Sequence, residues 1–316
     1  MKEQIYSLRI DAVHSLCVKE FYCEKSFDNQ KQPILLIHGA TIASELWVND
    51  YKQYSWCHRL ASLGYHVFTC DLLGFGMSKA DISLLKITDT RATEMSKHAV
   101  KLIDHILHTT SHDKLSAIAC SWGTVILTEI LTKKNHNISK AVFYAPISYD
   151  SNAANYWLKK YESIPINNIG EKSGYVSVDA NNFIARWDEE IPAEDKSTWR
   201  NDKVLMSIIN NTTFNSATKN SSFLVPSGPL EDLADIFSNK IIHHPKRIKT
   251  PSLVIRASHD LTSTEKSSRD FFNSIQSSEK TYCEIKNGTH FALLEKTMEK
   301  IFAQTLIFLE NNKKHK

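Results

Sequence analysis

From residue 34 onward, short apolar runs rich in β-branched residues alternate with longer segments of helical periodicity. This alternation is typical of a mostly parallel sheet with helices on both faces, so it predicts an α/β fold. The expected strands cover residues 34–39, 65–72, 115–120, 141–146, 252–258 and 280–285. The expected helices cover residues 91–108, 122–134, 264–275 and 294–311. Two earlier segments, 7–10 and 18–25, are expected to form an antiparallel pair that leads into the sheet.

The stretch from 147 to 235 interrupts this alternation. It has no clear buried strand, it has short helical pieces, and it contains ten aromatic residues, Trp157 and Trp187 among them. We interpret it as a mainly helical lid, or cap, inserted into a core that residues 1–146 and 236–316 form. For most of these aromatic side chains, the expected role is to build the lid's own small core.

Charge and hydropathy narrow the classes of function. The 38 basic and 35 acidic residues leave a formal charge of +3, and the basic residues are scattered apart from the short KKHK tail. This pattern favours neither a nucleic acid nor a membrane surface as a partner. The first 16 residues lack the apolar stretch of a signal peptide, and no segment has the apolar length of a membrane span. We therefore expect a cytoplasmic protein; no sequence feature sets its oligomeric state.

The six cysteines show no CxxC spacing and no regular framework, which predicts reduced thiols rather than disulfides. His105 and His108 have helical spacing but no companion ligands, so no metal site is expected.

The segment Ala119-Cys120-Ser121-Trp122-Gly123 joins an apolar strand directly to a helical pattern. It has the G-x-S-x-G arrangement, with alanine in the first small position. A turn this sharp tolerates only small residues on either side of the serine and lifts the hydroxyl clear of the sheet. The adjacent helix N-terminus favours developing negative charge, so the pattern predicts Ser121 as a nucleophile.

A serine hydroxyl is a weak nucleophile unless a base accepts its proton, and the base needs an acid to orient it. Asp260 and His290 each follow an expected strand, at the same edge of the sheet as Ser121. The order Ser, Asp, His is the one expected on this kind of fold. As an alternative, Asp260 caps a short turn that begins with Thr262, and Asp150 is the reserve candidate for the acid.

The negative charge that develops on a carbonyl oxygen must be met by preorganised donors. Gly39, at the first strand exit, allows a tight turn that can direct the amide of Ala40 at the site. Trp122 supplies a second amide directly after the serine. His38 is expected to brace this loop rather than to act as a base.

Taken together, these residues resemble the α/β-hydrolase superfamily, specifically its lidded serine hydrolases. The resemblance begins with an HG loop at 38–40, a D-x-x-G-x-G-x-S loop at 71–78 and the serine turn at 119–123. It continues with a P-x-L-V-I…D strand exit at 251–260 and a final G-T-H at 288–290. It spans about residues 30–310 without the lid. It implies a nucleophile, acid and base at Ser121, Asp260 and His290, and an oxyanion hole from the amides of Ala40 and Trp122.

Haloalkane dehalogenases and epoxide hydrolases share this fold, but they use an aspartate as the nucleophile, a role that Ser121 cannot take. The leading hypothesis is therefore a serine hydrolase that cleaves a carboxylic ester or lactone without a metal or organic cofactor. The aromatic-rich lid favours a mid-sized, largely apolar small molecule, such as a macrocyclic lactone, as the substrate. The alternatives are C–C bond hydrolysis or acyl transfer by the same residues, and a ligand-binding receptor on a hydrolase scaffold.

Overall fold

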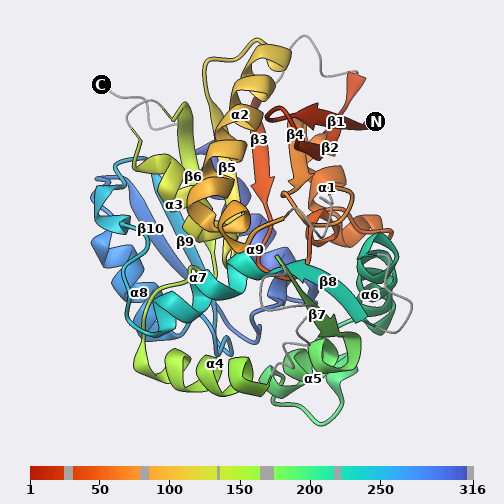
Figure 1. The fold of residues 1–316 in the computed structure, drawn as a ribbon. Helices are drawn as coiled ribbons and strands as arrows, with labels where there is room; N and C mark the ends of the chain where they lie inside the picture. Colours follow the sequence, from red (N-terminus) through yellow and green to blue (C-terminus); the bar gives the residue numbers. More distant parts are fainter. Residues whose placement is uncertain (25–30, 79–84, 134–135, 164–173, 217–221, 312–316) are drawn as a thin grey trace.

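The computed structural model describes residues 1–24, 31–78, 85–133, 136–163, 174–216 and 222–311. Its centre is an eight-stranded sheet with the order β1-β2-β4-β3-β5-β6-β9-β10 (Figure 1). The strands are β1 (Lys2–Arg9), β2 (Ser15–Tyr22), β3 (Lys31–Ile37), β4 (Tyr65–Asp71), β5 (Leu115–Cys120), β6 (Ile138–Tyr144), β9 (Ser252–Ala257) and β10 (Lys280–Ile285). Each expected strand is present, with ends that shift by a few residues.

The sheet is parallel from β4 to β10 in the sheet order, and β2 is antiparallel to both β1 and β4. Every residue of β4, β5 and β9 is buried, because helices cover both faces of these strands. The chain leaves β3 for β4 on one side and later returns to β5 on the other side of β3. The carboxyl ends of β3 and β5 therefore flank a topological switch point, where open α/β sheets bind ligands.

The core helices are α1 (Trp56–Ser62), α2 (Ala92–Thr110), α3 (Gly123–Leu131), α8 (Glu265–Ser274) and α9 (Met298–Glu310). Helices α2 and α3 pack together on one face of the sheet (Figure 1), and α1 and α9 meet on the other, where the rings of Trp56 and Phe302 lie 5.0 Å apart between centroids. Helix α1 was not predicted, because its seven residues are too short for a clear period.

One predicted helix, 294–311, is interrupted at its start. A short 3-10 turn (Ala292–Leu294) comes first, and α9 begins only at Met298. The break falls at Glu295, whose buried carboxylate accepts hydrogen bonds from Thr289 and from the indole of Trp187. These tertiary bonds hold the residue out of the helix that its periodicity favours.

The stretch 147–235, here called the inserted segment, contains α4 (Ser151–Ser163), α5 (Ala180–Glu190), α6 (Asp202–Ser216) and α7 (Ser227–Phe237). It also contains a two-stranded antiparallel sheet of β7 (Tyr175–Asp179) and β8 (Ser222–Pro226). The prediction that this stretch has no buried strand was thus wrong: both strands have only five residues, and 42 residues separate them, so no hairpin signal marks the pair. Residues 164–173 and 217–221 of the predicted lid lie outside the described residues.

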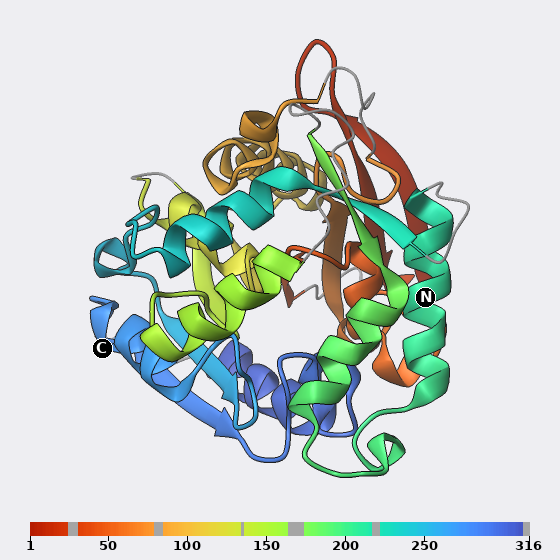
Figure 2. The ribbon, with the colours of Figure 1, turned by 60° about the horizontal axis from the view of Figure 1, so that its bottom comes forward.

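The inserted segment lies at the edge of the sheet where the parallel strands end. Figure 1 shows α4, α5, α7, β7 and β8 together below the tip of β3, and Figure 2 shows the same elements ringed around that edge. All six cysteines are free thiols, as predicted. Among the helices in the described residues, none combines the length and apolar character needed to cross a membrane.

Candidate active site

Ser121 lies at a sharp turn between β5 and α3. Its φ is 53°, a left-handed conformation that is strained for a residue with a side chain. A methyl group added at Gly123 would lie 2.3 Å from the carbonyl oxygen of His38, and one added at Gly39 would lie 3.2 Å from the Cβ of Ser121. The ends of β3 and β5 and the start of α3 can approach this closely only because residues 39 and 123 are both glycine.

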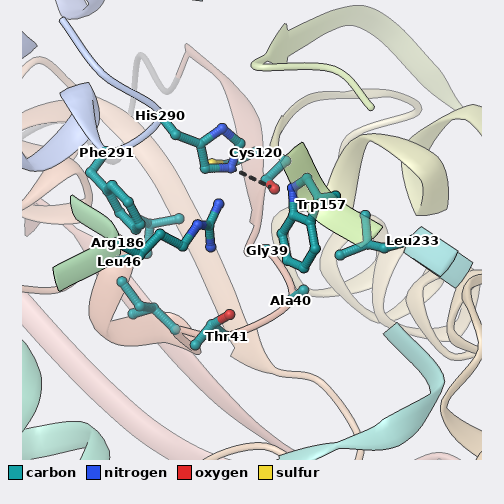
Figure 3. Close-up of a pocket in the computed structure, with 12 residues that line it drawn as sticks. Gly39, Ala40, Thr41, Leu46, Cys120, Trp157, Arg186, Leu233, His290 and Phe291 are labelled. Carbon is teal, nitrogen blue, oxygen red and sulfur yellow. Dashed lines mark hydrogen bonds between the residues drawn. The ribbon is translucent and has the colours of Figure 1, made fainter. Parts of the chain in front are cut away.

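The side chains of Ser121, His290 and Asp260 form one hydrogen-bonded chain. The Nε2 atom of His290 is 2.9 Å from the Oγ of Ser121, and its Nδ1 atom is 2.8 Å from the Oδ2 of Asp260 (dashed contact to the serine in Figure 3). Because a carboxylate can only accept, Nδ1 carries the proton, and Nε2 is left with a lone pair for the hydroxyl of Ser121. Ser121 is 9% exposed, so solvent can still reach this buried group.

Asp260 also has the capping role that was its alternative interpretation. Its Oδ1 accepts the backbone N–H groups of Thr262 at 2.8 Å and Ser263 at 2.7 Å, while Oδ2 faces His290. The two roles use different oxygens, so they coexist.

Asp150, the reserve candidate for the acid, serves a different element. Its Oδ2 accepts from the hydroxyl of Thr264 at 2.9 Å and from the amide of Ala153 at 3.4 Å. Within the described residues no hydrogen bond joins Asp150 to His290. The structure thus brings Asp260, and not Asp150, to the imidazole.

Glu190 is a residue of this site that the sequence analysis did not identify. Its Oε2 accepts the backbone N–H of His290 at 2.7 Å. Burial raises the pKa of Glu190 well above its usual 4.5, and repulsion from Asp260 adds to the shift. No motif marks Glu190, because it lies in the inserted segment 100 residues before its partner.

The two amides expected to form an oxyanion hole follow β3 and Ser121. Within the part of the chain that the structure describes, neither the N–H of Ala40 nor that of Trp122 donates a hydrogen bond. Ala40 is 7% exposed, whereas Trp122 is fully buried. Gly39 does not have a positive φ; the close approach to Ser121 is what requires a glycine there.

His38 braces this loop, as its position suggested. Its Nδ1 donates to the carbonyl oxygen of Gly39 at 2.8 Å, and its Nε2 accepts from the N–H of Leu72 at 3.1 Å. Burial lowers the pKa of His38 to about 4, which keeps the ring neutral and preserves both bonds at neutral pH.

A pocket that opens to solvent lies over Ser121. The core contributes one part of its lining, and the inserted segment contributes Trp157, Arg186 and Leu233. The core residues that line it are Gly39, Ala40, Thr41, Ile42, Leu46, Cys120, Ser121, His290 and Phe291. The lining is mostly apolar, and Arg186 is its one permanently charged side chain among the described residues.

In the described ranges, no three His, Cys, Asp or Glu side chains gather in a way that could hold a metal ion. His105, from the predicted helical pair, instead contacts the hydroxyl of Tyr6 through its Nε2 at 3.0 Å.

Comparison with known proteins agrees with this architecture. The family described as "Serine aminopeptidase, S33" matches residues 28–297 of the chain. No curated protein sequence matches it.

Among solved structures, an esterase from Thermogutta terrifontis is similar with a TM-score of 0.64 and 17% identity, over 97% of this chain and 98% of that chain. An epoxide hydrolase from Vigna radiata is similar with a TM-score of 0.68 and 14% identity, over 98% of each chain. An esterase from Exiguobacterium antarcticum is similar with a TM-score of 0.66 and 13% identity, over 97% of this chain and 99% of that chain. Similarity at such low identity shows the fold alone.

Proposed function

Because this chain belongs to the serine aminopeptidase S33 family of α/β-hydrolases, we propose that it is a serine hydrolase that cleaves a carboxylic ester or lactone. The observation that carries the proposal is the contact of the Ser121 hydroxyl with Nε2 of His290, whose Nδ1 is held by Asp260. This arrangement gives a serine the base and the orienting acid that nucleophilic attack requires.

In the first half of the reaction, the Oγ of Ser121 attacks the ester carbonyl while Nε2 of His290 takes the hydroxyl proton. The carbonyl oxygen becomes negatively charged, and the amides of Ala40 and Trp122 donate to it. The C–O bond to the alcohol then breaks, and His290 passes its proton to the leaving oxygen. The product of this half is an acyl-enzyme and a free alcohol.

In the second half, His290 takes a proton from water, and the hydroxide attacks the acyl carbonyl. The bond to Ser121 breaks, the serine oxygen recovers its proton from His290, and a carboxylic acid leaves. Asp260 keeps Nδ1 protonated and oriented in both halves and stabilises the imidazolium that forms.

The lining of the pocket supports an ester over a peptide with a free amino group. An aminopeptidase substrate carries an ammonium group, which favours a nearby carboxylate. None of the residues that line the pocket is Asp or Glu, and the one permanent charge is the cation of Arg186. Most of the remaining lining is apolar, which fits a largely apolar acyl or alcohol group. The inserted segment would act as a lid that bounds this pocket and selects the substrate.

Hydrolysis of a chain-length series of p-nitrophenyl esters tests the proposal. We expect the wild type to turn over and Ser121→Ala to lose at least about 10³-fold in kcat, because the nucleophile is gone. Ser62→Ala removes an exposed hydroxyl on α1 and serves as the matched control, with an unchanged rate. Labelling of Ser121 by a fluorophosphonate, located by mass spectrometry, detects the nucleophile independently of the substrate.

Equal rates in wild type and Ser121→Ala, or no labelling of Ser121, would contradict the proposal. The products separate ester hydrolysis from its alternatives: an ester gives an acid and an alcohol, whereas C–C hydrolysis gives an acid and a ketone.

A further inference from the structure

Arg186 places a guanidinium group in the pocket over Ser121. The residue belongs to α5, and Figure 3 shows its side chain directed into the space between His290 and Trp157. The carbon of the guanidinium lies 4.9 Å from the ring centroid of Trp157 and 5.2 Å from that of Phe291. Two aromatic rings thus hold the cation beside the atoms of the proposed reaction.

Most of the hydrogen-bonding capacity of this guanidinium is unused. Among the described residues its one hydrogen bond runs from Nη2 to the hydroxyl of Thr262, at 3.1 Å. Its Nε is fully buried and has no acceptor. A guanidinium has five N–H donors in one plane, so the two terminal nitrogens retain unused in-plane donors for a ligand.

The charge of Arg186 also lacks a full counter-ion. Within the described residues no carboxylate forms a salt bridge with it. Glu190, one helical turn further along α5, turns its Oε2 to the amide of His290 instead. Burial, more than repulsion from Asp260, raises the pKa of Glu190 and so disfavours the charged form of this carboxyl, while the charge of Arg186 opposes that shift. An unbalanced cation in an apolar pocket is costly unless a ligand supplies the opposite charge.

We propose that Arg186 binds a carboxylate group of the substrate, so that the enzyme prefers esters or lactones that carry a second, negatively charged carboxylate. This inference rests on the proposed ester hydrolysis at Ser121 and names its substrate class. A carboxylate matches the planar fork of a guanidinium with two parallel hydrogen bonds, and the apolar lining accommodates the methylene chain between the two ends. Hydrolysis would then yield a dicarboxylic acid and an alcohol.

The test compares the monoethyl esters of glutaric, adipic and pimelic acid with ethyl pentanoate, hexanoate and heptanoate, which replace the free carboxylate with a methyl group. We expect the wild type to prefer the charged series at one chain length. Arg186→Gln should lower kcat/KM for that monoester by about 10- to 100-fold, mainly through KM, because a charge-assisted pair of hydrogen bonds is lost. The neutral ester should change by less than about threefold.

Two further variants separate recognition from structure. Arg186→Lys keeps the charge but not the fork and should fall between wild type and Arg186→Gln. Arg247→Gln removes an exposed arginine outside the pocket and should leave both series unchanged. An equal loss of kcat/KM for both ester series in Arg186→Gln would show that Arg186 has only a structural role. That result, or a preference of the wild type for the neutral esters, would overturn the inference.

A binding measurement distinguishes this inference from the proposed function. Calorimetric titration of monomethyl adipate into Ser121→Ala requires no turnover. Binding that is lost on adding Arg186→Gln supports the carboxylate site even if no ester is hydrolysed, in which case only the proposed activity fails. Equal affinity with and without the arginine would overturn the inference whatever the activity.

Discussion

The two carboxylate oxygens of Asp260 have different partners. One oxygen orients the imidazole of His290, and the other holds the turn that follows Asp260. Oδ2 receives the Nδ1–H of His290, while Oδ1 receives two backbone amides of the following turn. The turn therefore holds the carboxylate independently of its bond to the imidazole. An amide side chain in place of the carboxylate can still accept at one oxygen, so the turn can survive when the charge is removed.

Asp260→Asn should preserve the fold and remove most of the activity. The asparagine cannot hold a protonated Nδ1 and stabilise an imidazolium as the carboxylate does, so we expect kcat to fall by roughly 10³- to 10⁴-fold. Ester hydrolysis and thermal melting should be measured on the same samples. Asp150→Asn is the matched control, because it changes a buried carboxylate that accepts hydrogen bonds from Ala153 of α4 and from Thr264 instead of from His290. Its kcat should stay within about threefold. Similar losses in the two variants would count against the assignment of Asp260 as the acid.

Sequence alone predicted the residues that follow core strands. Ser121 directly follows β5, and Asp260 and His290 lie in the loops after β9 and β10. Because parallel strands end at one edge of the sheet, these loops bring the three residues together. Glu190 and Arg186 escaped prediction for a physical reason. Both lie on α5, whose contact with the site depends on how the inserted segment packs, and no local pattern encodes that packing.

At the scale of elements, α7 is tied to the serine turn through one carboxylate. Asp232 accepts the amide of Ala92 at 2.7 Å and the indole N–H of Trp122 at 2.9 Å, and it pairs with Arg91. Its side chain is 3% exposed. Three elements, α2, α3 and α7, thus share one buried acceptor, and the inserted segment is fixed to the residue that follows Ser121.

Asp232→Ala should destabilise the protein more than the substitution of any exposed charged side chain does. Two buried donors and the partly exposed guanidinium of Arg91 lose their acceptor, and we expect the free energy of unfolding to fall by about 3 kcal/mol. Urea denaturation measures this change. Asp235→Ala is the control, because Asp235 pairs with the same Arg91 but is more exposed, and it should cost less than about 1 kcal/mol. Equal costs for the two variants would show that Asp232 does not anchor α7.

The core elements were predictable because burial on both faces gives long apolar runs, as in β4, β5 and β9. The strands β7 and β8 were not, because each is short and meets its partner only across the intervening helices. The start of α9 was mispredicted because helical periodicity continues through Glu295, while its tertiary hydrogen bonds oppose the helix. Sequence periodicity thus mispredicts elements whose conformation depends on contacts with residues far away in the chain.

At the scale of the whole molecule, His243 couples folding to pH. Burial, more than the neighbouring His244, lowers the pKa of His243 from 6.5 to about 4. The unfolded chain binds a proton at this position as the pH falls through 6.5, whereas the folded protein does so only near 4. The contribution of the neutral imidazole to the free energy of unfolding is therefore fully present above pH 6.5 and is lost as the pH falls toward 4.

His243→Phe removes this titration and keeps an aromatic ring beside Phe271. Between pH 7 and pH 5.5 the wild type should lose about 1 kcal/mol more stability than the variant. The free energy of unfolding in urea, measured at several pH values, gives both curves. His38 titrates in both proteins, so the difference reports His243 alone; parallel curves would refute the coupling.

The pocket is built from two separate stretches of chain. Its floor comes from residues that follow β3, β5 and β10, and its far wall comes from the inserted segment. Substitutions in α4, α5 or α7 can therefore change which molecules the pocket accepts without altering the atoms that would make and break bonds. If the proposed hydrolysis holds, exchanging the described helices of the inserted segment would redirect it to new compounds, which makes these helices the first choice for directed evolution.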